Sequence, residues 1–253
     1  MFTPSQMKGK TAIVTGASSG LGRATSLALA EVGADLCLAD VNEAGLRLTA
    51  EEAQRAGVKV VVHAIDLADS LNCRSLVDAA VASFGKLDAL CNVAGVDIIC
   101  HMTEMSVSDY QRTIAVNLNA PFFLMQASLP HLLRTDGAIV NVASAAAYVG
   151  EAYNVAYAAS KAGLMHMTKS VAMEYSRTAI RVNAVAPGGM KTRMAQGVKL
   201  PEGMDASLFE RYLPVRGAVE VRDVARLIAY LASPAAEAFH GACISIDKGL
   251  AAG

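Results

Sequence analysis

The stretch TAIVTGASSGLGRA, residues 11–24, decides the fold that this sequence predicts. It opens with a β-branched, apolar run typical of a buried strand and closes with the start of a segment that has helical spacing. Between them stand Gly16, Gly20 and Gly22. Glycines at such a turn permit positive φ and close backbone approach, and the N-terminus of the next helix attracts phosphate. The stretch therefore predicts a phosphate-binding βα unit.

The same alternation continues along the chain. Further β-branched runs, separated by helical segments, occupy residues 35–39, 59–64, 87–92, 138–144, 180–186 and 243–247. Strand, helix, strand repeated about seven times predicts a doubly wound, Rossmann-like parallel sheet with helices on both faces. We expect residues 1–253 to form one α/β domain for dinucleotide binding and catalysis, because no linker or charge block divides them. Gly, Pro and Met interrupt the pattern at roughly 188–216, which we interpret as a substrate-binding lid.

The composition argues against several classes of function. The 53% hydrophobic content fits a sheet covered on both faces, and the net charge of −1 gives no sign of nucleic acid or membrane as a partner. The five cysteines are widely spaced, which favours reduced thiols in a cytoplasmic protein. The start of the chain does not resemble a signal peptide, and no apolar run is long enough for a membrane helix. The histidines are scattered, so we expect no metal.

Asp40 ends the second predicted strand, eighteen residues after Gly22. A carboxylate at this place can accept hydrogen bonds from the adenosine ribose of a dinucleotide, although a plain loop acid or helix cap is the simpler alternative. The glycine-rich turn also contains GASSG, which matches the G-x-S-x-G nucleophile elbow and would make Ser18 the nucleophile of a serine hydrolase. Such an elbow needs an oxyanion donor from an earlier strand, and no strand precedes residues 11–15.

The segment YAASK places Tyr157 and Lys161 four residues apart. On a helix these two positions share a face, so the ammonium can lower the pKa of the phenol, which is ordinarily about 10. Two ordinary residues on a solvated helix face are the simpler alternative. Ser144 ends a predicted strand thirteen residues before Tyr157, at the sheet edge where α/β folds bind ligands. Ser144 and Tyr157 could therefore hold one substrate oxygen between them.

Together these features resemble the short-chain dehydrogenase/reductase family over essentially the whole chain. The segments TGASSGLG, NVAG, YAASK and PGGMKT, with Asn117 and Ser144, occur in the family's order. The resemblance implies that Tyr157 is the catalytic acid and base and that Ser144 positions the substrate oxygen. It further implies that Lys161 lowers the pKa of Tyr157 and binds the nicotinamide ribose, and that Asn117 holds a water that relays protons to Lys161. Val93 departs from the family, which often has a second Asn there.

The resemblance also implies a set of cofactor contacts. These are Gly16, Ser18, Ser19, Gly20, Leu21, Gly22, Asp40, Asp66, Leu67, Asn92, Ala94, Gly95, Tyr157, Lys161, Pro187, Gly188 and Thr192. NAD is the expected cofactor, because the carboxylate of Asp40 would repel the 2′-phosphate of NADP. A homotetramer is also implied.

The predicted function is an NAD-dependent oxidoreductase that interconverts a neutral, apolar, cyclic secondary alcohol and its ketone. Asp97 and Glu151 are expected near the pocket mouth, where they would repel anionic substrates. Apolar lid residues would cover the substrate: Met190, Met194, Val198, Leu200, Met204, Leu208, Phe209, Tyr212 and Leu213. A 3-oxoacyl-thioester reductase of the same family is the alternative. A serine hydrolase and a nucleotide-binding protein without turnover are more remote ones.

Overall fold

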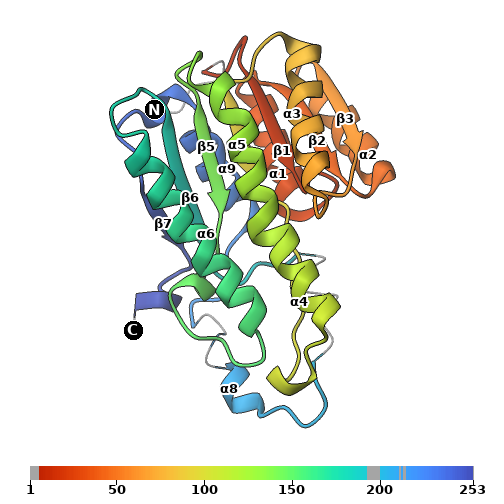
Figure 1. Cartoon of the computed structure of the whole chain (residues 1–253), viewed down its shortest axis with the longest axis vertical. Coiled ribbons are helices and arrows are strands. Elements are labelled where there is room, and N and C mark those ends of the chain that lie inside the picture. Colours follow the sequence, from red (N-terminus) through yellow and green to blue (C-terminus); the bar gives the residue numbers. More distant parts are fainter. Residues whose placement is uncertain (1–5, 193–199, 211, 213–214, 253) are drawn as a thin grey trace.

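The structure of the chain, a computed structural model, describes residues 6–192, 200–210, 212 and 215–252 and is built around one parallel sheet (Figure 1). Its strand order is β3-β2-β1-β4-β5-β6-β7. The strands are β1 (Thr11–Thr15), β2 (Asp35–Asp40), β3 (Val60–Ala64), β4 (Ala89–Asn92), β5 (Ala138–Val142), β6 (Arg181–Pro187) and β7 (Cys243–Ile246). Each strand coincides with one of the seven runs indicated by the sequence, with β2 and β6 extending one residue further, so the predicted fold class is confirmed.

Helices cover both faces of the sheet. The α-helices are α1 (Gly20–Glu31), α2 (Glu43–Gln54), α3 (Ser70–Phe84), α4 (Val107–Ile114), α5 (Ala120–Leu132), α6 (Val155–Glu174), α8 (Ala206–Glu210) and α9 (Val221–Ala232). Short 3₁₀ turns are η1 (Met102–Glu104), η3 (Ala145–Ala147), η4 (Pro234–Ala236) and η5 (Leu250–Ala252). One apolar cluster joins α1, α2 and α9 to the sheet, and a second joins α3, α5 and α6 to it. The two clusters show that the sheet is buried on both faces, as its continuous apolar strands require.

The strand order reverses at β1, which pairs with β2 on one side and with β4 on the other. In open α/β sheets this switch point leaves a crevice beyond the carboxyl ends of the strands. The glycine-rich turn follows β1, the NVAG segment begins in β4, and Ser144 follows β5. Thr15 ties the first two segments together, because its hydroxyl accepts the N–H groups of Val93 and Ala94, each at 3.0 Å.

A π-helical turn, η2 (Ala115–Asn119), connects α4 to α5. The N–H of Ala120 bonds the carbonyl of Ala115, five residues earlier, so the three segments form one continuous helix with a wider turn in its middle. Asn117 lies within this turn and is completely buried. The π turn could not be predicted, because apolar spacing does not distinguish five residues of π-helix from α-helix.

The predicted lid is described in part. Residues 193–199, 211, 213 and 214 lie outside the described residues, and with them Met194, Val198 and Leu213, as does the side chain of Phe209. In the described part the backbone N–H of Asp205 donates to the Tyr153 hydroxyl at 2.8 Å. Tyr153 has a left-handed backbone (φ 65°), and its ring meets the edge of His101. The segment before α8 is therefore held against the loop before α6.

Candidate active site

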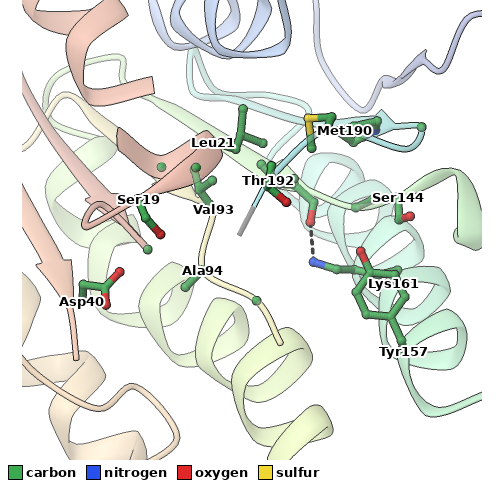
Figure 2. A pocket seen from close by; sticks show the side chains of 18 residues that line it. Ser19, Leu21, Asp40, Val93, Ala94, Ser144, Tyr157, Lys161, Met190 and Thr192 are labelled. Atoms are coloured by element: carbon green, nitrogen blue, oxygen red, sulfur yellow. Dashed lines mark hydrogen bonds between the residues drawn. The ribbon is translucent and has the colours of Figure 1, made fainter. Parts of the chain in front are cut away.

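A cavity of about 200 Å³ lies at the carboxyl ends of β1, β4, β5 and β6. Figure 2 shows Asp40 and Ser19 at one side of it and Ser144, Tyr157 and Lys161 at the other. Most of the residues that the sequence assigned to cofactor or substrate line it: Gly16, Ser19, Gly20, Leu21, Gly22, Asp40, Ala94, Gly95, Ser144, Tyr157, Lys161, Pro187, Gly188 and Thr192. Val93, Val142, Ala143 and Met190 complete the lining. The structure therefore places most of the predicted cofactor and substrate residues around a single cavity.

The glycine-rich turn leaves no room for larger side chains. A Cβ on Gly22 would lie 2.0 Å from the carbonyl oxygen of Gly16, and a Cβ on Gly16 would lie 2.9 Å from the Cα of Ala94. Gly16 also has a φ of 68°, which glycine adopts without strain. Ser19, the residue before α1, makes no side-chain cap, so its hydroxyl does not occupy the end of this helix. The helix N-terminus thus faces the cavity with the local positive charge that suits a phosphate.

Asp40 is fixed by the backbone around it. One carboxylate oxygen accepts the N–H of Ser18 at 3.2 Å, and the other accepts the N–H of Asn42 at 3.0 Å. The remaining lone pairs of the carboxylate face the cavity that Asp40 lines. Ser18 itself is buried and lines neither of the two cavities described here, and those cavities contain no histidine. In these two cavities the serine hydrolase hypothesis therefore has neither its nucleophile nor a histidine base.

A second cavity, of about 110 Å³, continues from the first beyond Asp40. The two share Gly16, Asp40, Ala94 and Gly95, and the second adds the predicted Asp66 and Leu67. Its walls also include residues that the sequence did not indicate: Val41, Ile65, Val96, Arg112 and Val116. Arg112 and Val116 come from the α4 to α5 helix, whose approach to the end of β3 is a tertiary feature without a local sequence signal.

Tyr157 and Lys161 lie one turn apart on α6, as predicted, but Lys161 does not point at the phenol oxygen. Its Nζ donates to the carbonyl of Val142 at 2.8 Å and lies 5.6 Å from the centre of the Tyr157 ring (Figure 2). Lys161 is almost fully buried, with an exposed fraction of 3%. Ser144 and Tyr157 line the same end of the cavity, close enough for Ser144 to act on the pKa of the phenol.

The expected lowering of the pKa of Tyr157 is wrong for this structure. Burial of the phenol raises its pKa well above the usual range, the charges of Asp97 and Glu151 raise it further, and only the hydrogen bond with Ser144 opposes them. Burial also lowers the pKa of Lys161 to about 8, against an opposing effect of Asp97. A lowered pKa follows from the Lys161 charge alone. In the folded protein the loss of water around the phenol and the charges of the two carboxylates raise the pKa instead.

Asp97 and Glu151 lie near enough to Tyr157 for the charge of each to raise the pKa of its phenol. Burial raises the pKa of Asp97 to about 6, and a hydrogen bond from Asn154 and the charge of Lys161 partly offset this. The Nδ2 of Asn154 donates to Glu151 at 3.0 Å. Burial and the charge of Asp97 raise the pKa of Glu151 as well, while the Asn154 bond opposes the change. The substrate side of the site is therefore electrostatically negative.

Asn117 and Asn92 lie behind the cavity surface and line neither cavity. The Asn117 amide donates to the carbonyl of Val96 and accepts its N–H, each at 2.9 Å, and also donates to Ser160. A Cβ on Gly95 would lie 3.4 Å from the Asn117 oxygen and 3.6 Å from Nζ of Lys161, so the π turn, the NVAG segment and Lys161 meet here. Asn92 donates to Asn141 at 2.8 Å in the core.

This combination defines a class: a dinucleotide-binding oxidoreductase with a tyrosine and a lysine on one helix. Comparison with known families agrees, since a family model described as enoyl-(acyl carrier protein) reductase matches residues 16–251. The chain belongs to the short-chain dehydrogenase/reductase family. It is accordingly an enzyme that couples alcohol and ketone chemistry to a nicotinamide dinucleotide.

Curated relatives resemble the chain over nearly its whole length. The 3-oxoacyl-[acyl-carrier-protein] reductase FabG of Thermotoga maritima is 35% identical over 246 residues, which cover 97% of this chain and 99% of that one. The cis-4-hydroxycyclohexanecarboxylate dehydrogenase of Sinomonas cyclohexanicum is 37% identical over 245 residues, covering 96% and 97%. Among solved structures, carveol dehydrogenase of Mycobacterium avium in complex with NAD is 25% identical with a TM-score of 0.87, covering 98% and 100%.

The cavities fit a nicotinamide dinucleotide. Between Tyr157 and Asp66 the cavities pass the glycine-rich turn, where a Cβ would leave no room, and the N-terminus of α1. They then pass Asp40, whose carboxylate is held by backbone N–H groups. Within the described ranges, no three His, Cys, Asp or Glu side chains are grouped to hold a metal ion. No helix in the described part of the chain is long and apolar enough to cross a membrane.

Proposed function

We propose that the protein is an NAD-preferring dehydrogenase that interconverts a neutral, apolar, cyclic secondary alcohol and its ketone. The observation that carries this proposal is the meeting of Ser144, Tyr157 and Lys161 at one end of a cavity whose other end holds Asp40. That separation allows the reacting carbon and the adenosine half of a dinucleotide to occupy opposite ends of one continuous hollow.

Ser144 and Tyr157 supply the hydrogen bonds to the substrate oxygen, because both side chains line the same end of the cavity. Bound NAD supplies the hydride acceptor for the carbinol carbon, and NADH the donor for the reverse reaction. Tyr157 takes the hydroxyl proton during oxidation and returns it during reduction. Its raised pKa keeps the phenol neutral, which suits proton donation to a ketone. Lys161 adds a positive charge behind the ring only below its pKa of about 8.

The preference for NAD rests on Asp40. Its carboxylate lines the cavity and is held there by two backbone N–H groups. The ribose hydroxyls of NAD can donate to such a carboxylate, whereas the 2′-phosphate of NADP would meet a like charge. The residue that follows, Val41, is exposed and cannot compensate the charge.

The substrate class rests on charge and on apolar walls. Asp97 and Glu151 make the region of Tyr157 negative, which disfavours a carboxylate near the reacting carbon. Ala143 and Met190 line the cavity and Ala145 and Ala146 lie buried beside Ser144, so small and apolar groups surround the substrate end. Relatives named for ring alcohols, such as the cyclohexanecarboxylate and carveol dehydrogenases, support a cyclic substrate. The 3-oxoacyl-thioester reductase stays as the second candidate, because FabG is similarly related to this chain.

The test follows nicotinamide absorbance with a panel of substrates. We expect kcat/KM to be higher for cyclohexanol and larger neutral ring alcohols than for 3-hydroxybutyrate or a 3-oxoacyl thioester. Tyr157→Phe should abolish turnover while NAD binding, measured by calorimetry, stays near the wild-type value. Tyr110→Phe is the control, since Tyr110 is exposed on α4. Near-normal kcat in Tyr157→Phe would refute the proton-transfer role, and a thioester ranked first would favour the second candidate.

The proposed assembly is a homotetramer in the cytoplasm. Exposed apolar side chains on α4, α5 and α6, among them Val107, Phe122 and Met173, support contacts between subunits. Light scattering during size-exclusion chromatography measures the subunit number directly.

A further inference from the structure

The second cavity is mostly apolar, with Asp40 where it adjoins the first cavity and a charged pair of residues elsewhere on its lining. Val41, Ile65, Leu67 and Val116 form most of its side-chain walls, and Asp66 and Arg112 stand together at its margin. Because this cavity adjoins the first at Asp40, it lies where the proposed cofactor would place its base, beyond the ribose. Apolar walls suit the faces of a flat ring, so any discrimination between bases must come from the charged edge.

The edge is an ion pair between two distant parts of the chain. Nη1 of Arg112, on α4, lies 2.9 Å from Oδ1 and 2.7 Å from Oδ2 of Asp66, which follows β3. Oδ1 also accepts the N–H of Ala68 at 3.0 Å. These contacts lower the pKa of Asp66, with the Arg112 hydrogen bond as the largest cause. The carboxylate is thus ionised, and it is held from two sides before any ligand arrives.

Both partners are partly exposed, at 39% for the Arg112 side chain and 48% for the Asp66 side chain. An ion pair at such a place contributes little to the stability of the fold. Its geometric effect is larger, since Asp66 without Arg112 would keep only the Ala68 contact and could turn toward water. A carboxylate with a fixed orientation loses less entropy when it accepts a hydrogen bond from a ligand.

We infer that Arg112 is a positioning residue for base recognition: its ion pair with Asp66 fixes an acceptor at the edge of the second cavity that selects a base with an exocyclic amino group. Adenine donates from its 6-amino group to such an acceptor. Hypoxanthine has a carbonyl oxygen at the same position and meets the carboxylate with a like partial charge. The inference rests on the proposed cofactor, and it adds a residue that acts through Asp66.

Calorimetry of NAD and of nicotinamide hypoxanthine dinucleotide tests the inference by equilibrium binding, without turnover. We expect wild-type protein to prefer NAD by about tenfold, the size of one hydrogen bond to a charged group. Arg112→Gln should reduce this preference to about threefold or less, and Arg112→Lys should retain part of it. Asp66→Asn should reduce or reverse the preference, since the introduced amide can donate to the carbonyl of hypoxanthine.

Lys86→Gln is the matched control. Lys86 has a similar exposed fraction, 41%, and also pairs with an aspartate, Asp88, but at the opposite end of the sheet. It should keep the wild-type preference despite the same change in net charge. The inference is overturned if Arg112→Gln keeps or increases the preference, or if it weakens both dinucleotides by the same factor. Absence of NAD binding to the wild-type protein would instead overturn the proposed cofactor, and with it the inference.

Discussion

Asp97→Asn should make the protein more stable above pH 6, although the substitution lies beside the proposed catalytic groups. Burial raises the pKa of Asp97 from 3.8 to about 6 in the folded state. The unfolded chain ionises this carboxyl near pH 4, while the folded protein still holds the proton. Ionised Asp97 therefore costs the folded state stability, and the loss develops as pH rises from about 4 to about 6.

The pKa difference sets the size of the effect. A change from 3.8 to about 6 corresponds to about 3 kcal/mol, an upper limit because the side chain is partly exposed to water. The Oδ1 atom of Asp97 and the Oδ1 atom of Asn154 are both buried without a donor among the described residues. The introduced amide can donate to the Oδ1 atom of Asn154, so the substitution is also compatible with the local hydrogen bonds.

Urea unfolding at intervals from pH 4 to pH 8 measures the difference between Asp97→Asn and wild type. We expect a difference that grows by about 1 to 3 kcal/mol up to pH 6 and then stays constant. Asp78→Asn, an exposed change on α3, should give a difference that does not vary with pH. A flat or falling difference for Asp97→Asn would show that its carboxyl is not destabilised by burial. The same variant should shift the rise of alcohol-oxidation kcat/KM to lower pH, because Asp97 raises the pKa of Tyr157.

Three further substitutions test the cofactor side of the site. Asp40→Ser should raise kcat/KM with NADP by about tenfold or more, since it removes the repelling charge, and an unchanged NADP to NAD ratio would contradict the proposed preference. Gly22→Ala should lose NAD binding in calorimetry and about 3 kcal/mol of unfolding free energy, because the added Cβ would overlap the Gly16 carbonyl oxygen. Gly150→Ala is the control and should leave both quantities unchanged, since open space surrounds Gly150. Equal effects of the two substitutions would contradict the role of Gly22 in the cofactor site. Lys161→Ala should impair both NAD binding and kcat, and intact NAD binding would remove the ribose contact from its proposed role.

The strands could be predicted from the sequence because the central sheet is parallel and covered on both faces. A strand such as β6 then consists almost entirely of buried residues, and its apolar run is visible without any knowledge of its neighbours. The grouping of Ser144, Tyr157 and Asp40 was also predictable, since carboxyl ends of parallel strands meet at one edge. The position of a residue at the end of a strand, or its spacing along a helix, can be recognised from the neighbouring sequence alone.

What could not be predicted depends on residues far apart in the chain. The pKa of Tyr157 is set by burial and by Asp97, sixty positions earlier, and no local pattern relates the two. The turn of Lys161 toward Val142 likewise requires the packing of α6 on β5. Arg112 could not be predicted, because its place at the second cavity follows from its ion pair with Asp66, 46 positions earlier in the chain. Loss of water and long-range charge are properties of the folded molecule.

Because of the π turn, the direction of the Asn117 side chain depends on the number of residues in the helix from α4 to α5. Each residue of an α-helix advances the side chains by about 100°, and η2 accommodates its residues through a bond that spans five positions. Deletion of Ala115 would allow a regular α-helix with α4 and α5 in about the same relation, but it would change the direction of the residues within the turn, Asn117 among them. Asn117 and Arg112 could then no longer face Val96 and Asp66 together. In an evolving lineage, one lost codon here would disable the enzyme while every functional side chain remained in its gene.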